Sequence, residues 1–464
     1  MEQTLIYHGA ARKALDWVRE SRYTSSQIVI GVFLGMILLG TLLLMLPFAT
    51  TGQGIRFIDA LFTMTSAVCV TGLIVLDTPK DFTLFGQLVI LLGIQLGGLG
   101  YSTIATLLLL ALGRRIGLRD RMMMMEVLNT LSMEGLVRFV KVIVLITFAI
   151  EGVGAIVLTA RFAPDMEIGR AVYFGVFHSL SAFNNAGFAL FSDSLFSYRG
   201  DVVVNVTVLG LTIFGGLGFL VYRDFLENLA GARFRLTTHT KLALTVTGLL
   251  LVLGTFALWG LEIRNDRTLA KLPFGEQWMV AFFHAVAART AGFSTVDVNF
   301  MSIPTLYLMI LLMVIGASPG STGGGIKTTT FGIICAAIWT TLKGRADVTM
   351  FHRRIPHELV LKSYALATMA IGMVTGLTML LSYTEDAEFL RLMFEVASAS
   401  ATVGLSTGDG GALSLSALFS DFGKCVIIAA MFVGRLGPLM VGLFTVKTHE
   451  DLRYRYPEAR VVLG

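Results

Sequence analysis

Long apolar stretches separated by short polar ones run along almost the whole chain. A helix needs about 20 apolar residues to cross a hydrocarbon core of about 30 Å, and the run QIVIGVFLGMILLGTLLLMLPF at residues 27–48 is long enough. The pattern predicts eight membrane-spanning segments, at about residues 27–48, 82–112, 139–160, 202–222, 240–261, 304–342, 359–383 and 424–446. The predicted fold class is therefore an all-α polytopic membrane protein.

Composition agrees with a location in a lipid bilayer. Of the 464 residues, 55% are hydrophobic and 14% are charged, and the mean hydropathy is +0.76, which is too apolar for one water-soluble core. Residues 1–26 are polar and the apolar run that follows is too long for a cleavable signal peptide. Cys69, Cys335 and Cys425 are scattered inside apolar segments, which argues against a disulfide framework or a zinc site.

Basic residues are concentrated in alternate connections between the apolar segments. Residues 1–26, 113–138, 223–241, 343–362 and 447–464 together carry 22 of the 36 Lys and Arg residues. The positive-inside rule places these segments in the cytoplasm, so both termini are expected there. The same bias accounts for the net charge of +5, and we expect no nucleic-acid partner.

Four short segments of the chain align with one another without gaps. They are FTMTSAVCVTGL (62–73), FHSLSAFNNAGF (177–188), FFHAVAARTAGF (282–293) and FEVASASATVGL (394–405). Each begins with Phe, has Ala five residues on and has Gly ten residues on, at Phe62, Phe177, Phe282 and Phe394, at Ala67, Ala182, Ala287 and Ala399, and at Gly72, Gly187, Gly292 and Gly404. The regular spacing predicts four diverged copies of one unit of about 110 residues.

Each aligned segment lies in an extracellular or lumenal connection between two spanning segments. Its helical part, of about 12 residues, reaches roughly 18 Å, which is half of a bilayer. The chain must therefore enter the membrane and return. Non-helical backbone is tolerated at that depth only where protein covers it or where it lines a water-filled cavity, and four such loops around one axis would make a pore.

The chemistry of these segments suits a cation. The C-terminal end of a short helix carries a partial negative charge, and backbone carbonyls beyond it can replace the water shell of an ion, with glycine letting the chain turn them inward. No carboxylate is needed. The fourth segment reads TVGL at 402–405, close to the TVGY of a potassium-channel filter. For any single segment, tight helix packing would explain the glycine, so the prediction depends on all four.

The fourfold signature resembles the Trk/Ktr/HKT superfamily of potassium transporters over about residues 27–446. The larger Trk type has an extra N-terminal helix pair that is not evident here, so the chain resembles the Ktr-type membrane subunit. The resemblance implies four helix, pore-helix, helix units around one central ion pore. The implied divisions are a cytoplasmic segment at 1–26, pore unit 1 at 27–112, a cytoplasmic connection at 113–138, pore unit 2 at 139–224, pore unit 3 at 225–342, pore unit 4 at 343–446 and a cytoplasmic tail at 447–464.

The resemblance also implies which residues hold the ion. They are Val70, Thr71 and Gly72, Asn185, Ala186 and Gly187, Thr290, Ala291 and Gly292, and Thr402, Val403 and Gly404, which we call the filter residues. In this superfamily a glycine in the first filter accompanies potassium selectivity and a serine accompanies sodium transport. Gly72 therefore implies K⁺ uptake across the cell membrane, and a sodium-permeable or ion-coupled symporter is the alternative.

The stretch GASPGSTGGGIKTTT (316–330) has the glycines, lysine and threonines of a phosphate-binding loop. Ile326 separates Gly325 from Lys327, and a membrane helix rather than a strand is predicted before it, so the phosphate-loop pattern fails. Pro319 and the glycines disfavour a helix, while hydroxyls can satisfy the freed backbone groups. A static kink is the plainer interpretation of such a break.

The resemblance gives this stretch a role as a gate beneath the filter. The implied gate residues are Gly316, Ala317, Ser318, Pro319, Gly320, Ser321, Thr322, Gly323, Gly324, Gly325, Lys327 and Arg435. Arg435 lies in the last apolar segment, where a charge is a functional candidate. It is expected to repel potassium or to pair with carbonyls of the loop. The alternatives are an arginine that snorkels to the interface or satisfies a helix end and, for Lys327, an anchor at the cytoplasmic side.

Other polar and glycine-rich positions have structural interpretations. Asn184, Arg289 and Glu395 are expected to brace the filter, and His178 and His284 to make local hydrogen bonds. The GGLG clusters at 97–100 and 215–218, with Gly434, Gly437 and Pro438 in the last unit, are expected to allow close helix approach. The methionine run at 122–125 is a candidate interfacial helix or partner surface.

The resemblance implies that the chain is a homodimer bound to a cytosolic ring of RCK/KTN-type nucleotide-binding regulatory subunits. The predicted soluble segments are all short, so the chain itself is expected to bind no nucleotide. The Ktr type also raises activation by Na⁺, without pointing to residues that would bind it. A membrane enzyme such as a nucleotide-consuming pump is a further class, but the chain lacks a Walker lysine or a His/Asp/Glu cluster in a soluble segment.

Overall fold

The computed structural model describes residues 25–52, 54–100, 136–229, 235–408 and 412–437. The methionine run at 122–125, residues 438–446 of the last predicted span and the tail at 447–464 lie outside these residues, as do most of the segments 1–26 and 113–138. The described part is almost entirely helical, as predicted. One antiparallel hairpin of β1 (Thr349–Met350) and β2 (Arg353–Arg354) was not predicted.

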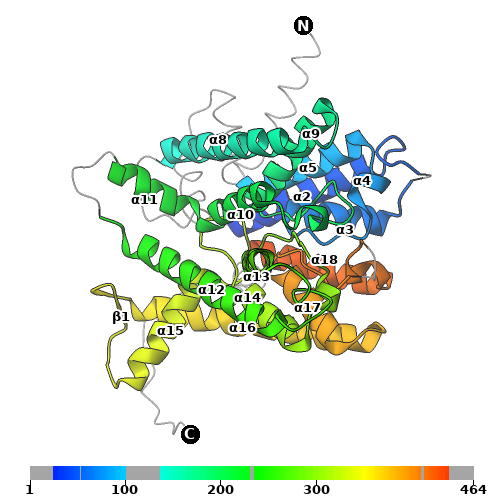
Figure 1. Ribbon diagram of the computed structural model, residues 1–464. Coiled ribbons are helices and arrows are strands. Elements are labelled where there is room, and N and C mark those ends of the chain that lie inside the picture. The colour runs from blue at the N-terminus through cyan, green and yellow to red at the C-terminus, as the bar shows by residue number, and fades with distance from the viewer. Residues whose placement is uncertain (1–24, 53, 101–135, 230–234, 409–411, 438–464) are drawn as a thin grey trace, which may run out of the picture.

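Three kinds of helix recur in the same order four times (Figure 1). A long apolar helix comes first: α2 (Ser25–Leu44), α8 (Leu136–Phe162), α12 (Thr238–Glu262) and α16 (His357–Thr384). A shorter helix that ends at the filter residues follows, and we call it the pore helix: α3 (Phe57–Val68), α9 (Ile168–Phe183), α13 (Phe274–Ala287) and α17 (Phe389–Ser400). The third helix is α5 (Leu84–Leu99), α10 (Val202–Leu217), α14 (Ile303–Val314) or α18 (Asp421–Leu436).

Within the described residues, two of the third helices are followed by a continuation helix, and a short helical piece follows each set of filter residues. The continuations are α11 (Phe219–Leu229) after α10 and α15 (Thr328–Leu342) after α14. The short pieces are α4 (Thr78–Asp81), η1 (Phe196–Tyr198), η2 (Val298–Phe300) and η3 (Leu415–Leu418). Residues 315–327 separate α14 from α15. The helix of the third unit is thus interrupted where the sequence predicted a break.

The predicted span at 202–222 is wrong as a single helix. The chain turns by 89° between α10 and α11, at Gly218, whose φ is 90°. Within the described residues, four helices are long and apolar enough to cross a membrane, or five if this bent pair is one span. The apolar run continues through the bend, so hydropathy alone could not reveal it. A left-handed glycine ends a helix at little steric cost.

Glycines of the third helices lie against the ends of the pore helices. A Cβ on Gly97, Gly215 or Gly434 would stand closer than 3.0 Å to a backbone carbonyl. In each case this carbonyl belongs to the last residue of the pore helix in the same unit: Val68, Phe183 and Ser400 respectively. The prediction of close approach is confirmed for these three glycines, but a Cβ on Gly100 or Gly437 would meet nothing within 4 Å, so it is wrong there. The end of each of these three pore helices is fixed by backbone contact.

The third unit departs from the aligned sequence pattern. Phe62, Phe177 and Phe394 are fully buried, whereas Phe282 is 36% exposed and Phe283 is buried in its place. The helix α13 ends five residues before its filter glycine, whereas the other pore helices end four residues before theirs. An ungapped alignment cannot show such a shift, because neighbouring helix positions differ by about 100° around the axis.

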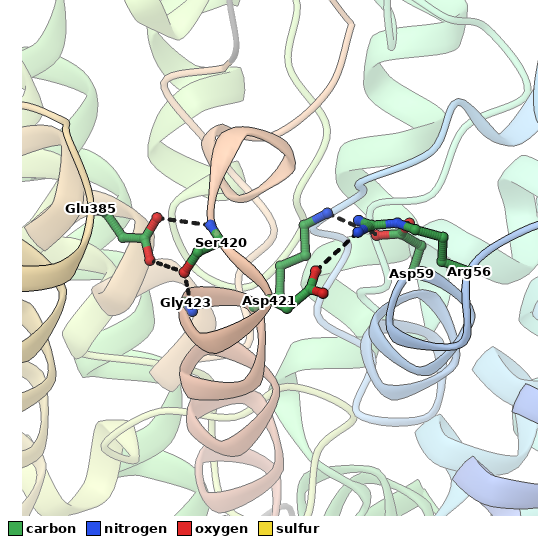
Figure 2. Close-up of polar contacts among 7 residues, drawn as sticks. Arg56, Asp59, Glu385, Ser420, Asp421 and Gly423 are labelled. Carbon is green, nitrogen blue, oxygen red and sulfur yellow. Dashed lines mark hydrogen bonds and ion pairs between the residues drawn. The ribbon is translucent and has the colours of Figure 1, made fainter.

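Polar contacts join the first unit to the last unit. The helices α3 and α18 pack together, and Arg56 binds both oxygens of Asp59, at 2.8 and 3.1 Å, and reaches Asp421 at 3.1 Å (Figure 2). The Lys424 ammonium donates to Asp59 at 2.8 Å, with the two side chains only 5% and 10% exposed. A buried ion pair therefore joins segments more than 360 residues apart in the chain.

Replacing Lys424 with methionine should lower the free energy of unfolding by about 1–2 kcal/mol. The loss is moderate because Arg56 still neutralises Asp59 after the ammonium is gone. Thermal unfolding in detergent, followed by tryptophan fluorescence, would measure it. Lys362→Met, at an exposed ion pair on α16, is the matched control and should change little. The double variant K424M/D59N should regain part of the lost unfolding free energy, because it no longer buries a carboxylate that has lost its lysine. If K424M unfolds with the same free energy as the native chain, the Lys424–Asp59 ion pair does not stabilise the fold.

Candidate functional site

The backbone takes the same unusual shape after each pore helix. The first filter residue has a positive φ: 56° at Val70, 59° at Asn185, 79° at Thr290 and 52° at Thr402. The glycine two residues later does too: 89° at Gly72, 71° at Gly187, 74° at Gly292 and 92° at Gly404. Positive φ is costly for Val and Thr, so the surroundings impose it, as is common at functional sites. A left-handed residue at every second position turns successive carbonyls toward one side instead of alternating them.

The four filter glycines form a closed ring, which we call the filter ring. Each faces the backbone carbonyl of the central filter residue in the next copy. A Cβ on Gly72 would meet the oxygen of Ala186, one on Gly187 would lie 3.1 Å from that of Ala291, one on Gly292 would lie 2.8 Å from that of Val403, and one on Gly404 would meet that of Thr71. The contacts run through the four copies in chain order and return to the first, so the filter residues surround one axis.

The filter ring can hold a cation without any charged side chain. The eight filter residues other than glycine are all buried, and their backbone carbonyls lie where four pore helices end. The helix ends contribute partial negative charge, and a ring of carbonyls can replace the hydration shell of an ion. Because each glycine abuts a carbonyl of the next copy, the filter ring has no room for a side chain at these positions.

A cavity of about 280 Å³ adjoins the filter ring, and we call it the vestibule. All four filter glycines line it. Its other walls come from the residues that follow the filter in each unit, including Asp77, Ser192 and Ser294. The filter ring can therefore be reached from this side through a partly polar space.

Serines in the pore helices hold the filter backbone in place. The Ser66 hydroxyl accepts a hydrogen bond from the Gly72 amide, and the Ser398 hydroxyl accepts one from the Gly404 amide, each at 3.0 Å. In the second copy, Ser181 donates to the Phe188 carbonyl at 2.7 Å. Sequence reasoning missed these residues, although a serine six residues before the filter glycine in three of the four segments was visible.

Asn184 and Glu151 form a polar cluster behind the second copy. The Asn184 amide donates to Gln95 at 2.8 Å and to Glu151 at 2.9 Å, and Gln95 donates to the second Glu151 oxygen at 3.1 Å. Glu151 is 1% exposed in the long helix α8. Its carboxylate within an apolar helix was a signal that sequence reasoning did not use.

The other expected braces also contact the filter region. Glu395 accepts hydrogen bonds from the Ser416 amide at 3.0 Å and the Ser406 hydroxyl at 2.6 Å, which tie α17 to the chain beyond the filter. His178 and His284 each bond locally to the carbonyl four residues earlier, as predicted, but His178 also accepts a hydrogen bond from the Leu190 amide at 3.2 Å, beyond the filter. Arg289 is 7% exposed and donates to the Gly316 carbonyl at 3.1 Å. The third filter segment is thereby linked to the start of the glycine-rich break.

The break between α14 and α15 forms a loop directly against the filter residues, and we call residues 316–327 the gate loop. Ile315 and Ile326 pair across its base. From unit 2, the Gly216 carbonyl accepts from the Ser318 amide at 3.0 Å, and the Phe219 amide donates to the Gly320 carbonyl at 2.8 Å.

The gate loop also touches two filter segments. The Gly324 amide donates to the Thr402 hydroxyl at 3.0 Å, and a Cβ on Gly323 would press on the Thr290 hydroxyl. The gate loop is thus held by three of the four units. Such specific packing favours a defined structural role over a simple kink that relieves crowding.

Two basic side chains donate to carbonyls of the gate loop, Lys327 from within the loop and Arg435 from α18. Lys327 donates to the Gly323 carbonyl at 2.6 Å, and Arg435 donates to the carbonyls of Thr322 and of Gly97 in α5. The interpretation of Lys327 as an anchor at the membrane surface is wrong, because its ammonium turns back into the loop. Arg435 does not snorkel either, since its guanidinium joins the gate loop to unit 1. Gly97 lies in the last turn of α5, so the alternative that Arg435 satisfies a helix end also holds.

Comparison with known proteins decides the family. The profile of the TrkH family, described as "Cation transport protein", matches residues 4–455. The chain belongs to this family. The resemblance based on the four repeated segments is therefore confirmed.

Relatives of the chain include named uptake proteins. Ktr system potassium uptake protein B of Vibrio alginolyticus is 42% identical over 438 residues, which cover 94% of each chain. Potassium/sodium uptake protein NtpJ of Enterococcus hirae is 38% identical over 450 residues, 96% of this chain and 98% of that one. The crystal structure of the potassium transporter TrkH from Vibrio parahaemolyticus matches with a TM-score of 0.73 at 18% identity, over 92% of this chain and 86% of that chain, and confirms the helical membrane fold.

Proposed function

We propose that this chain is the membrane subunit of a Ktr-type system and takes up potassium across the cell membrane through the filter ring. The observation that carries this proposal is the closed ring of glycines, each against a carbonyl of the next copy. Four helix ends and a ring of backbone oxygens favour a cation over an anion and let it shed its water. The relatives named as potassium and potassium/sodium uptake proteins support the same ion.

The filter residues hold K⁺ mainly through backbone carbonyls in this proposal. Gly72 in the first copy favours potassium over sodium. The four pore units keep the boundaries predicted from the sequence, with both termini in the cytoplasm. The vestibule then faces the outside of the cell, and the gate loop lies on the cytoplasmic side of the filter ring.

The gate loop closes the pathway in the same proposal. It lies against Thr290 and Thr402, and Lys327 and Arg435 hold its carbonyls. Opening requires these bonds to break together, which makes the closed state cooperative. A segment that is rich in glycine and interrupts a helix can adopt a second conformation at small cost.

Regulation comes from partners rather than from this chain. We propose a homodimer seated on a cytosolic ring of RCK/KTN-type nucleotide-binding subunits, because the predicted soluble segments are too short to form a nucleotide-binding domain. The word "system" in the name of the Vibrio alginolyticus relative supports a multi-component assembly. Activation by Na⁺ belongs to this proposal, with no residue assigned to it.

The alternative function is a sodium-permeable or ion-coupled member of the family. The name of the Enterococcus hirae relative, which includes sodium, favours it. Gly72 opposes it, because the resemblance associates a serine at this position with sodium transport. The two functions share the same pathway and differ in the ion that the filter ring prefers.

Flux into liposomes that contain the purified chain should separate these functions. We expect K⁺ and Rb⁺ to permeate at least about tenfold faster than Na⁺, measured with radioactive tracers or by ion-selective fluorescence. Equal rates for K⁺ and Na⁺ would favour the alternative. Absence of flux for all three ions, with or without added regulatory subunits, would contradict transport. ATP hydrolysis by the chain alone would point to a pump instead.

A further inference from the structure

Three buried side chains behind the second filter segment bond to one another in a closed ring, which we call the polar triangle. Its corners are Gln95 on α5, Glu151 near the middle of α8 and Asn184 directly after α9. Asn184 Nδ2 donates to Gln95 Oε1 and to Glu151 Oε1, and Gln95 Nε2 donates to Glu151 Oε2. Each corner is at most 9% exposed, so the polar triangle is closed to solvent.

The aligned positions of the other units hold different residues. The position before the first filter residue is Asn184 in the second copy, and in the others it is Cys69, Arg289 and Ala401. Gln95 comes two residues before Gly97, and the residues two before Gly215 and Gly434 are Ile213 and Phe432. The repeated fold therefore forms without a polar triangle. Its presence points to a task that belongs to the second copy.

Asn184 connects the polar triangle to the filter ring. It directly precedes Asn185, whose φ is 59°, and its side-chain amide also donates to the Leu180 carbonyl in the last turn of α9 at 2.9 Å. The next residue, Ala186, carries the carbonyl that faces Gly72 of the first copy. A shift of Asn184 would therefore move a carbonyl of the filter ring two residues away.

Glu151 suits this place because a carboxylate accepts hydrogen bonds with both oxygens, whereas an amide has one oxygen and one NH₂ group. With an amide at all three corners, the ring could close only if Asn184 accepted one bond and donated the other. Its side chain would then have to turn, because its oxygen now lies in the space that a Cβ on Gly98 would need. The carboxylate of Glu151 thus fixes the orientation of Asn184.

We propose that Glu151 is a positioning residue for ion selection, which acts through Asn184 to hold the second filter segment at the spacing that favours K⁺ over Na⁺. This inference rests on the proposed function, because it needs the filter ring to select the ion. Backbone carbonyls distinguish cations by where they stand around the ion. A supporting side chain that is lost lets them move without closing the path, and preference suffers before rate.

Glu151→Gln should lower the ratio of K⁺ to Na⁺ flux about threefold to tenfold, which corresponds to the loss of about one buried hydrogen bond. The K⁺ flux itself should fall less than this ratio, because the path stays open. Gln95→Met removes another corner and should shift the ratio in the same direction, so the inference stays testable if E151Q does not fold. Tracer flux of each ion through liposomes measures both quantities.

The double variant Q95E/E151Q returns a carboxylate to the ring at a different corner. Asn184 then donates again to two oxygens, and the amide at position 151 donates to the carboxylate at position 95. The ratio of K⁺ to Na⁺ flux should recover most of its native value. Such recovery would identify the hydrogen bonds of the ring, rather than the side chain at one position, as the cause.

Glu262→Gln is the matched control for E151Q. Glu262 is 2% exposed and lies at the end of α12, the first helix of unit 3. It accepts hydrogen bonds from Thr268, Thr305 and Ser302, and none of these three residues adjoins a filter residue. E262Q should therefore lower the thermal stability and leave the ratio of K⁺ to Na⁺ flux native.

Three results would overturn the inference: an unchanged ratio in both E151Q and Q95M, an equal fall of the ratio in E262Q, or a double variant as unselective as E151Q. A native chain without preference for K⁺ would contradict the proposed function, and this inference with it. A selective native chain beside an equally selective E151Q would overturn the role of Glu151 alone and leave the filter ring as the selecting element.

Discussion

Gly404→Ala should reduce potassium flux by at least about tenfold and bring the rates for K⁺ and Na⁺ close together. The Cβ would stand closer than 3.0 Å to the Thr71 carbonyl oxygen, and the residue has a φ of 92°. An L-residue in that conformation is strained by about 1–2 kcal/mol. The filter ring must therefore open at this point, and displaced carbonyls no longer fit one ion size. Tracer flux of both ions through liposomes measures the effect.

Gly376→Ala is the matched control for this variant. Gly376 lies on α16, and a Cβ there would meet nothing within 4 Å, so both flux and ion preference should stay native. Comparable yield and thermal stability of the two variants would separate a filter defect from misfolding. If G404A keeps the native ratio of K⁺ to Na⁺ flux, the filter ring does not select the ion.

The four glycines of the filter ring were predictable from the sequence because the constraints on them are local. A position that needs a positive φ and abuts another backbone accepts little besides glycine. Gly72, Gly187, Gly292 and Gly404 therefore persist while most of each repeat has diverged. The break at 316–327 was predictable for a similar reason, since Pro319 and five neighbouring glycines rule out a regular helix.

Pairings between distant residues were not predictable in this way. Lys424 and Asp59 lie 2.8 Å apart in the fold. Nothing in their sequence positions indicates that these two charged residues form a pair. Lys327 has the position of a membrane-surface anchor and turns inward only because the gate loop offers carbonyls. The bend at Gly218 could not be predicted from hydropathy, because the residues on both sides of it are apolar.

The third unit shows how a repeat can mislead. Its glycine aligns with the others, but the helix before it ends one residue earlier relative to that glycine, and Arg289 stands where the other copies have Cys69, Asn184 and Ala401. Arg289 donates to the Gly316 carbonyl at 3.1 Å. This difference places a charged contact between the filter and the gate loop in the one unit that contains the gate loop.

Arg435→Gln should raise potassium flux in the absence of regulatory subunits by about tenfold, with the preference for K⁺ over Na⁺ unchanged. Arg435 holds the Thr322 carbonyl of the gate loop and the Gly97 carbonyl of α5. A hydrogen bond to a charged group contributes about 1.5–3 kcal/mol, and its loss shifts the population toward the open state accordingly. Removing a positive charge beside the path also lowers the barrier for a cation. The filter ring itself is untouched, so selectivity should survive.

Flux through liposomes with and without regulatory subunits would measure both effects. Arg391→Gln removes the same charge from the first turn of α17, where the side chain is 35% exposed, and should leave flux at the native level. Deletion of residues 316–325 should exceed the effect of R435Q, because it removes the gate loop together with its remaining bonds to Lys327 and Thr402. If both R435Q and the deletion leave unregulated flux unchanged, this loop is not the gate, whereas a loss of selectivity in R435Q would place Arg435 in the filter rather than below it.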